Sequence, residues 1–317
     1  MDDIGEAVLA RRMGESLHAK RRQGEHDRIA EACRYVSPKF TYLKIHVFRP
    51  IEVAMLKAFG LYRRGLRNFL DVRVVENDIP VANLPEALEG FSILHLSDLH
   101  IDIDPAIIGA VSRAVSGVAC DVCVLTGDYM NLTVGDPTNA IALMSELRRS
   151  LPSPAYAVLG NHDTLDMVAP LERADYRILL NEHDVIRRDD ASIVIAGVDD
   201  PYIYQTHSIG RAMASAPDAA VRILLSHSPV IHAEAAAAGF DAMLCGHTHG
   251  GQVCLPGGIP ILNNDRASRR FISGRWTDGR MQGYTSRGTG GCGLPVRYFC
   301  PAEVTLHRLR RKGGKAA

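Results

Sequence analysis

The sequence lacks the features of an exported or membrane-spanning protein. No run of about 18 apolar residues occurs among its 317 residues, so no segment is expected to cross a bilayer as a helix. Arg11 and Arg12 resemble a twin-arginine export start, but charged residues follow them, so we expect no signal peptide. The seven cysteines are odd in number and follow no framework spacing, which favours a reduced compartment, the cytoplasm.

The sequence also lacks net charge and has few aromatic residues. Lys and Arg together number 36, as do Asp and Glu, so no bulk attraction to nucleic acid is expected. The sequence does not indicate a nuclease, because it has no long basic stripe interleaved with aromatic residues. The apolar content of 46% is ordinary, so the chain can bury the core of one large domain with a modest extension.

Three regions are expected along the chain. Residues 1–70 predict an N-terminal helical extension, and the mixed charges of residues 1–36 are typical of a helix that faces water. Residues 71–309 alternate short apolar strands with helices, which predicts a single catalytic domain of the α/β class. Residues 310–317 are basic and predict a disordered tail. Strands are expected at 72–76, 91–97, 121–126, 154–159, 192–198, 221–226, 240–245, 252–255, 283–287 and 302–308, and helices at 105–116, 138–150, 166–175 and 229–238.

The segment 49–70 has two interpretations. Its apolar residues recur at roughly helical spacing, basic residues lie between them, and acid is nearly absent. A basic amphipathic helix can lie on an anionic membrane surface. The same pattern also fits a helix that packs on the domain with a basic outer face, and Gly60 and Gly65 weaken either helix.

Five clusters of metal-ligand residue types each follow an expected apolar strand. They are Asp98 with His100, Asp128 with Asn131, Asn161 with His162 and Asp163, His227 alone, and His247 with His249. Because loops at the carboxyl ends of strands build the sites of α/β domains, we expect these clusters to meet. Taken singly, Asp128 could instead form a turn or helix cap, and His227 could be a core histidine.

Together, the clusters resemble the calcineurin-like metallophosphoesterase superfamily. Its ordered pattern is D-x-H, G-D-x-x-[DN], G-N-H-[DE], a single His and then G-H-x-H, and all five blocks occur here in that order between about residues 91 and 250. The resemblance implies a metal-dependent hydrolase of phosphoric esters. It also implies a four-layer αββα sandwich of two mixed β-sheets, with the site along one edge.

The resemblance further implies two divalent metal ions and a role for each block. One metal would be held by Asp98, His100 and His249, and the other by Asn161, His227 and His247, with Asp128 as the bridge. His162 would act catalytically beside the scissile phosphate, and we expect Asp163 to orient and charge its imidazole. Oxygen and nitrogen ligands without cysteine suit manganese, iron or zinc.

Two further segments bear on the substrate. Residues 249–252 and 288–303 are similar to a bacterial branch of the superfamily that includes small phosphodiesterases and a UDP-2,3-diacylglucosamine pyrophosphatase of lipid A biosynthesis. The glycines of 288–293 either cradle a phosphate or form a flexible turn. Arg287 and Arg297 either hold a substrate phosphate or pair on the surface, and Asn131 is a further expected substrate contact.

Three functions remain open from the sequence. The first is hydrolysis of a lipid-linked or nucleotide-sugar phosphodiester or pyrophosphate at the inner face of the membrane, with peripheral contact through 49–70. The second is a soluble phosphodiesterase or phosphatase that acts on small nucleotides. The third is a non-catalytic metal-binding scaffold, which the complete ligand set disfavours.

Overall fold

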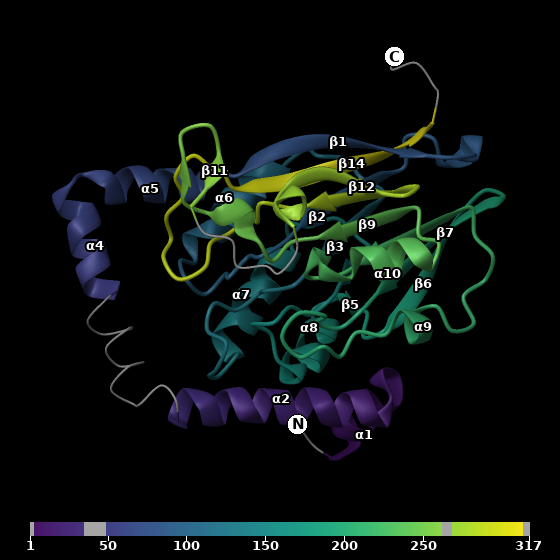
Figure 1. The fold of residues 1–317 in the computed structure, drawn as a ribbon, viewed down its shortest axis with the longest axis horizontal. Helices are drawn as coiled ribbons and strands as arrows, with labels where there is room; N and C mark the ends of the chain where they lie inside the picture. Colours follow the sequence, from purple (N-terminus) through teal and green to yellow (C-terminus); the bar gives the residue numbers. More distant parts are fainter. Residues whose placement is uncertain (1–2, 35–48, 262–267, 313–317) are drawn as a thin grey trace.

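Two six-stranded β-sheets face each other in the computed structural model, which describes residues 3–34, 49–261 and 268–312. Helices cover the outer faces of both sheets, as Figure 1 shows. The expected α/β sandwich of two mixed sheets is therefore confirmed. The interior lies between the sheets, where Ile93, Val124, Val158, Ile195 and Ile223 are fully buried in one apolar cluster.

The first sheet has the strand order β1-β14-β2-β3-β4-β5. Its strands are β1 (Arg73–Val81), β14 (Glu303–Arg311), β2 (Ser92–Leu96), β3 (Val122–Leu125), β4 (Ala155–Ala157) and β5 (Arg177–Ile178). Strands β2 to β5 run parallel, and only the β14–β2 pair is antiparallel. Helices α6 (Ala106–Val115), α7 (Thr138–Arg148) and α8 (Val168–Arg173) bury apolar faces in a cluster with this sheet.

The second sheet has the order β12-β13-β9-β8-β7-β6. Its strands are β12 (Gly274–Asp278), β13 (Met281–Thr285), β9 (Ala242–Cys245), β8 (Val221–Leu225), β7 (Ala191–Gly197) and β6 (Glu182–Arg188). Helices α9 (Ile209–Ala212) and α10 (His232–Ala237) cover it, and β10 (Cys254–Leu255) and β11 (Ile259–Pro260) form a separate hairpin. Short 3₁₀ turns lie at Glu86–Leu88, Leu165–Met167, Pro229–Ile231, His249–Gly251 and Arg269–Phe271.

Several elements differ from the sequence-based expectation. Strand β6 was not expected, because its sequence is mostly charged. It lies at the edge of the sheet and pairs only with β7, and charged residues are common on edge strands. Strands β5, β11 and β12 were also missed, and each is short or at an edge. Strand β14 continues to Arg311, so the first two residues of the expected tail belong to the sheet.

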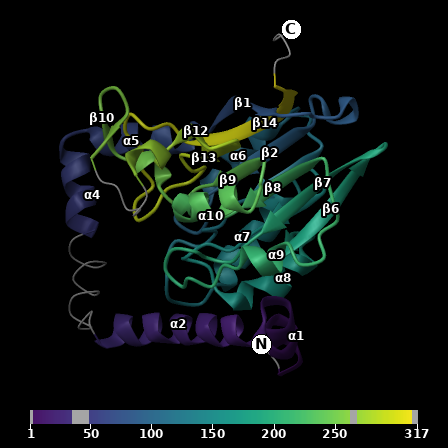
Figure 2. The ribbon, with the colours of Figure 1, turned by 45° about the vertical axis from the view of Figure 1, so that its right-hand side comes forward.

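The N-terminal helices α1 (Asp3–Met13) and α2 (Glu15–Arg34) pack against the domain, and the expectation of a water-facing helix is wrong. Leu9, Met13 and Arg21 are each at most 3% exposed. Figures 1 and 2 show α2 lying along one side of the sandwich. The charge composition did not reveal this because some charged residues of α2, such as Arg21 and Arg22, pair with the domain, whereas others, such as Glu15 and Asp27, face water.

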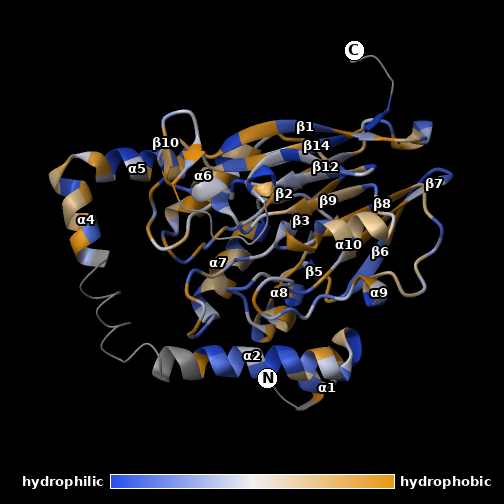
Figure 3. Ribbon diagram, in the orientation of Figure 1, coloured by the Kyte–Doolittle hydropathy of each residue, from blue (hydrophilic) through white to orange (hydrophobic). Residues whose placement is uncertain are grey.

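The segment 49–70 forms two helices, α4 (Arg49–Ala58) and α5 (Leu61–Leu70), separated at Gly60 with φ 67°. Helix α5 is docked: Phe69 is fully buried, and a Cβ at Gly65 would collide with Tyr298. Helix α4 instead exposes the apolar side chains of Ile51 at 49% and Met55 at 56%, and Phe59, which follows the helix, is 74% exposed. Figure 3 shows hydrophobic residues along α4. Within the described ranges, no helix combines the length and the apolar character that crossing a bilayer requires.

The inter-sheet core makes a stability prediction. Replacing Ile195 with Ala should lower the free energy of unfolding by about 2–5 kcal/mol, because it opens a cavity between two rigid sheets. Ile203→Ala is the control, since that side chain is 41% exposed and should cost less than about 0.5 kcal/mol. Urea unfolding followed by circular dichroism measures both, and equal costs would contradict the assigned core.

Candidate metal centre

The loops after five strands converge at one edge of the sandwich. Strands β2, β3 and β4 of the first sheet and β8 and β9 of the second are each followed by at least one predicted ligand. The seven predicted ligands are Asp98, His100, Asp128, Asn161, His227, His247 and His249, and all are buried. The two sheets are joined here directly, because the His247 N–H donates to the Asp98 carboxylate at 3.0 Å.

One group of side chains could hold a first cation. Asp98, His100, Asp128 and His249 each offer one ligand atom within 4.8 Å of the others. His100 Nε2 lies 3.2 Å from His249 Nε2 and 3.7 Å from Asp128 Oδ2, and His249 Nε2 lies 3.5 Å from Asp98 Oδ1. This is the ligand set that the resemblance implied for one metal, together with the bridging carboxylate.

A second group adjoins the first and shares Asp128 with it. Asp128, His227 and His247 form this group. His227 Nε2 lies 3.2 Å from Asp128 Oδ2 and 3.1 Å from Asn161 Oδ1. His247 Nδ1 lies 3.2 Å from His227 Nε2. Asp128 therefore stands between the two groups, where a bridging carboxylate would have to be.

The donor chemistry of these groups fits a cation. The Nδ1–H groups of His100 and His227 donate to the main-chain carbonyls of Met130 and Thr126 at 2.8 and 2.7 Å. This fixes the tautomers, so both Nε2 lone pairs face the Asp128 carboxylate. Lone pairs that converge in this way repel one another unless positive charge lies between them.

The pKa shifts show the same attraction for positive charge. Burial has the largest single effect on the pKa of His227 and lowers it, but the carboxylates of Asp128, Asp98 and Asp200 together raise it to about 10. Conversely, although burial raises the pKa of Asp128, His227 and His162 hold it well below its usual range. Both shifts have one physical cause, the attraction between the Asp128 carboxylate and positive charge beside it.

The backbone of these loops is held in an unfavourable conformation. Five of the seven predicted ligands have positive φ: Asp98 at 52°, His100 at 39°, Asp128 at 58°, His247 at 72° and His249 at 52°. Such residues cost free energy and cluster at functional sites. Asp98 and His100 both lie beyond β2, which ends at Leu96.

Two glycines allow the loops to approach one another. A Cβ at Gly160 would collide with the Asp128 carboxylate, and a Cβ at Gly246 would collide with Ser97 and Asp98. Only glycine leaves room at these two positions for the carboxylates of Asp128 and Asp98. These glycines of the G-N-H-D and G-H-x-H blocks therefore set how closely neighbouring loops pack.

A buried chain of hydrogen bonds ends on Asp98 and was not foreseen. It runs from Asn77 through His307, His95, Thr126 and Ser97 to Asp98, with steps of 2.7, 3.3, 2.8, 2.7 and 2.6 Å. With each donor pointing toward Asp98, the tautomers of both histidines are settled. Burial lowers the pKa of His95 to about 3, which keeps that ring neutral. These hydrogen bonds, which start at Asn77 of β1, therefore help to hold the Asp98 carboxylate in place.

His162 and Asp163 occupy the site in different ways. His162 is partly exposed, its Nδ1–H donates to the Asn131 carbonyl at 2.7 Å, and its Nε2 lies 3.9 Å from Asp128 Oδ2. The Asp163 carboxylate instead accepts from the main-chain N–H groups of Asp128, Tyr129 and Gly160, each at 2.8 Å. The expected pairing of Asp163 with the His162 ring is therefore wrong, and Asp163 ties the two loops together.

The three side chains expected to contact substrate, those of Arg297, Arg287 and Asn131, bind other groups of the protein. Arg297 is fully buried and donates to the carbonyls of Gly290 and Arg287 at 2.7 and 2.8 Å, so its expected phosphate contact is wrong. Arg287 pairs with Glu303 at 2.9 Å, and because Glu303 is buried this is not the surface pair that was the alternative interpretation. Asn131 Oδ1 accepts from the Gly293 N–H at 2.9 Å, so this side chain tethers the glycine loop to the site.

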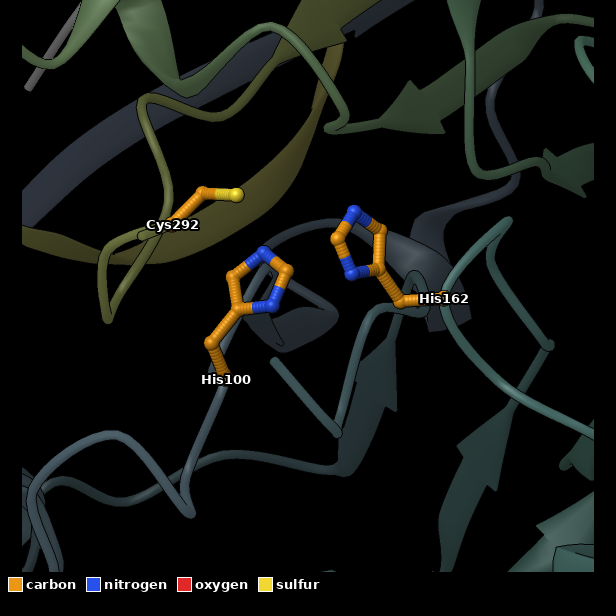
Figure 4. Close-up of side chains that lie close together, drawn as sticks. All are labelled: His100, His162 and Cys292. Carbon is orange, nitrogen blue, oxygen red and sulfur yellow. The ribbon is translucent and has the colours of Figure 1, made fainter. Parts of the chain in front are cut away.

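Cys292 lies at the mouth of the site and was not foreseen. Its thiol is grouped with His100 and His162, with ligand atoms within 4.8 Å of one another. Figure 4 shows its sulfur pointing toward the two imidazoles. The signal in the sequence is its place among the glycines of 288–293, the segment expected either to cradle a phosphate or to form a flexible turn.

Comparison with known proteins gives a consistent family. The model of calcineurin-like phosphoesterases matches residues 91–251. The uncharacterized metallophosphoesterase YkoQ of Bacillus subtilis is 26% identical over 268 residues, which cover 82% of this chain and 98% of YkoQ. Phosphodiesterase YaeI of Escherichia coli is 29% identical over 234 residues, covering 69% and 82% of the two chains.

Among solved structures, the sulfate thiohydrolase SoxB of Thermus thermophilus is a distant match. It is 13% identical with a TM-score of 0.43, and the alignment covers 72% of this chain and 58% of SoxB.

The position of Asp128 between the two groups makes a prediction for metal content. Asp128→Asn should reduce bound metal at both places and lower turnover about a hundredfold or more, because each group loses its shared anionic ligand. Elemental analysis and a phosphodiester assay measure the two effects. Asp136→Asn, a change at an exposed helix cap, is the matched control. Wild-type metal and turnover in Asp128→Asn would remove Asp128 from the site.

Proposed function

The chain belongs to the calcineurin-like phosphoesterase family, and from that premise we propose that it cleaves a phosphodiester or pyrophosphate bond with two divalent cations. One observation carries the proposal: Asp128 is shared by two groups of buried acceptors. Asp98, His100 and His249 would hold one cation, and Asn161, His227 and His247 the other. Manganese, iron and zinc all suit these ligands.

The residues around the centre have distinct tasks in this reaction. When bound, the two cations supply Lewis-acid chemistry that neutralises phosphate oxygens and activates water. His162 is held by the Asn131 carbonyl at Nδ1, which leaves Nε2 as the atom that exchanges a proton with the leaving oxygen. Asp163 keeps the Asp128 and Gly160 loops in register, so that His162 and the ligands face the same phosphate.

We propose further that the natural substrate is amphiphilic, of the class that includes UDP-2,3-diacylglucosamine. Apolar side chains are exposed on α4, directly after it and on the β10–β11 hairpin: Ile51 and Met55, then Phe59, then Leu255 and Ile259. The exposed cations Lys57, Arg63, Arg64 and Arg67 lie on α4 and α5. Apolar and cationic side chains together suit an anionic lipid surface.

This docking surface, formed by α4, α5 and the β10–β11 hairpin, adjoins the metal centre. Arg64 and Phe299 line one cavity of about 280 Å³ together with Gly257 and Gly258 of the hairpin, which connects α5 to it. The hairpin begins at Cys254, a few residues after His249. Gln252 between them donates to the carbonyl of Cys292 at 3.1 Å. A lipid-borne phosphate could therefore reach the centre without leaving the surface.

A small nucleotide diester is the alternative substrate. The name of the relative YaeI specifies a phosphodiesterase and no lipid. A scaffold without catalysis is disfavoured, since every ligand position of the five blocks is filled and brought into reach of its neighbours. Assays with a panel of substrates distinguish both alternatives from the lipid proposal.

A substrate panel tests the proposed reaction. With manganese, iron or zinc, the protein should cleave bis(p-nitrophenyl) phosphate and UDP-2,3-diacylglucosamine, the latter with the higher kcat/KM. His162→Asn should lower kcat by about a hundredfold to ten-thousandfold and leave metal content unchanged, because the ring exchanges a proton without being a required ligand. Preference for cyclic nucleotides would favour the small-nucleotide alternative, and a metal-loaded protein inert to the whole panel would favour the scaffold.

Vesicle flotation tests the docking surface. The protein should float with vesicles of phosphatidylglycerol and phosphatidylethanolamine and not with phosphatidylcholine. Exchanging Arg63, Arg64 and Arg67 for Gln should weaken binding about a hundredfold, since each cation near an anionic surface contributes about 1 kcal/mol. Changing the exposed Arg113, Arg149 and Arg280 to Gln is the matched control. Equal flotation of both triple variants would refute docking through α5.

A further inference from the structure

The N-terminal helix α2 contacts the loop that carries two central residues of the site. Arg21 Nη2 donates to the main-chain carbonyl of Asp163 at 2.6 Å and approaches that of Gly160 at 3.4 Å. Arg28 donates to the carbonyl of Asn161. Two arginines of the extension thus reach the main chain of three of the four residues in the G-N-H-D block.

Arg21 is fixed from several directions. It is fully buried, and its Nη1 and Nε groups donate to Asp199 at 3.1 Å and to Glu25 at 3.0 Å. Its guanidinium lies 3.7 Å over the ring of Tyr204. A buried cation of this kind is tolerated only when its donors are satisfied, and here the loop carbonyls complete the set. The loop and the helix therefore hold each other in place.

The exit of the same loop is also held by α2. Glu25 Oε1, which accepts from Arg21, accepts as well from the main-chain N–H of Leu165 at 2.9 Å. Gly24 lies so close to Tyr204 that a Cβ there would collide with the ring. The contact between α2 and the domain is thus made at close range, beside the site.

We propose that Arg21 and Arg28 are positioning residues of the metal centre, acting through the main chain of the 160–163 loop. The contact with the Asn161 carbonyl orients the residue whose side-chain oxygen lies 3.1 Å from His227 Nε2. The contacts on either side keep His162 aimed at the same place. The N-terminal extension is then part of the active site and not only a connection to the docking surface. This inference rests on the proposed metal-binding role of Asn161.

Arg28→Met is the variant that tests the inference. Arg28 is partly exposed and donates to the Asn161 carbonyl and to the Tyr204 hydroxyl, so its loss leaves neither of the carboxylates that Arg21 contacts unpaired. Arg22→Met is the matched control, because Arg22 also lies on α2 and pairs with Glu6, Glu25 and Asp166, but not with residues 160–163.

The measurements are Mn²⁺ titration calorimetry on the metal-free full chain, and kcat and KM for bis(p-nitrophenyl) phosphate. Arg28→Met should weaken one Mn²⁺ equivalent about tenfold and lower kcat more than it changes KM, as loss of an outer partner of a ligand does. Arg28→Lys, which keeps a donor, should recover part of both. Arg22→Met should match the wild type in Mn²⁺ affinity.

Two outcomes would overturn the inference, and they are distinguishable. If Arg28→Met binds Mn²⁺ and turns over like Arg22→Met, α2 is only a structural arm, while the proposed function stands. If the wild type itself binds no Mn²⁺ and hydrolyses no diester, the proposed function fails and this inference fails with it.

Discussion

The carboxylate of Asp128 is the constraint on which the site depends. One oxygen lies within 4 Å of three imidazole Nε2 atoms, those of His100, His162 and His227. Among the residues that the structure describes, the ion pairs of this carboxylate are all with histidines, so positive charge beside it comes from a proton or from bound metal. The surrounding loops, with their positive φ values and their glycines, keep these repelling groups together.

The strain in the loops is offset by the rigidity of what lies behind them. Two parallel runs of strands present their carboxyl ends at one edge, and apolar side chains fully buried between the sheets hold the edges together. Hydrogen bonds then tie loop to loop, including those from the Asp163 carboxylate and the buried chain that ends at Asp98. The catalytic geometry is therefore a property of both sheets together.

The N-terminal extension divides into parts with different relations to the domain. Helices α1 and α2 bury charged and apolar side chains against it, with Arg21 beside the G-N-H-D loop. Helix α5 is docked as well, whereas α4 leaves its apolar residues in water. Helices α2 and α4 both mix charged and apolar residues, but the domain binds the buried cation of α2 and leaves the apolar residues of α4 exposed.

The sequence alone determined the α/β class, the family and the residues predicted to bind metal, because strand-end clusters such as Asp98-x-His100 and His247-x-His249 are local patterns that can be read without coordinates. Only the tertiary structure decided what each group touches. The Asp163 carboxylate binds main-chain N–H groups instead of His162, Arg297 donates to main-chain carbonyls, and Arg21 is buried against the domain although its helix was expected to face water. The physical reason is that hydrogen-bond partners and burial depend on residues distant in the chain. The type of a residue does not reveal whether its carboxylate or guanidinium contacts substrate, solvent or main chain, because tertiary packing determines the partner.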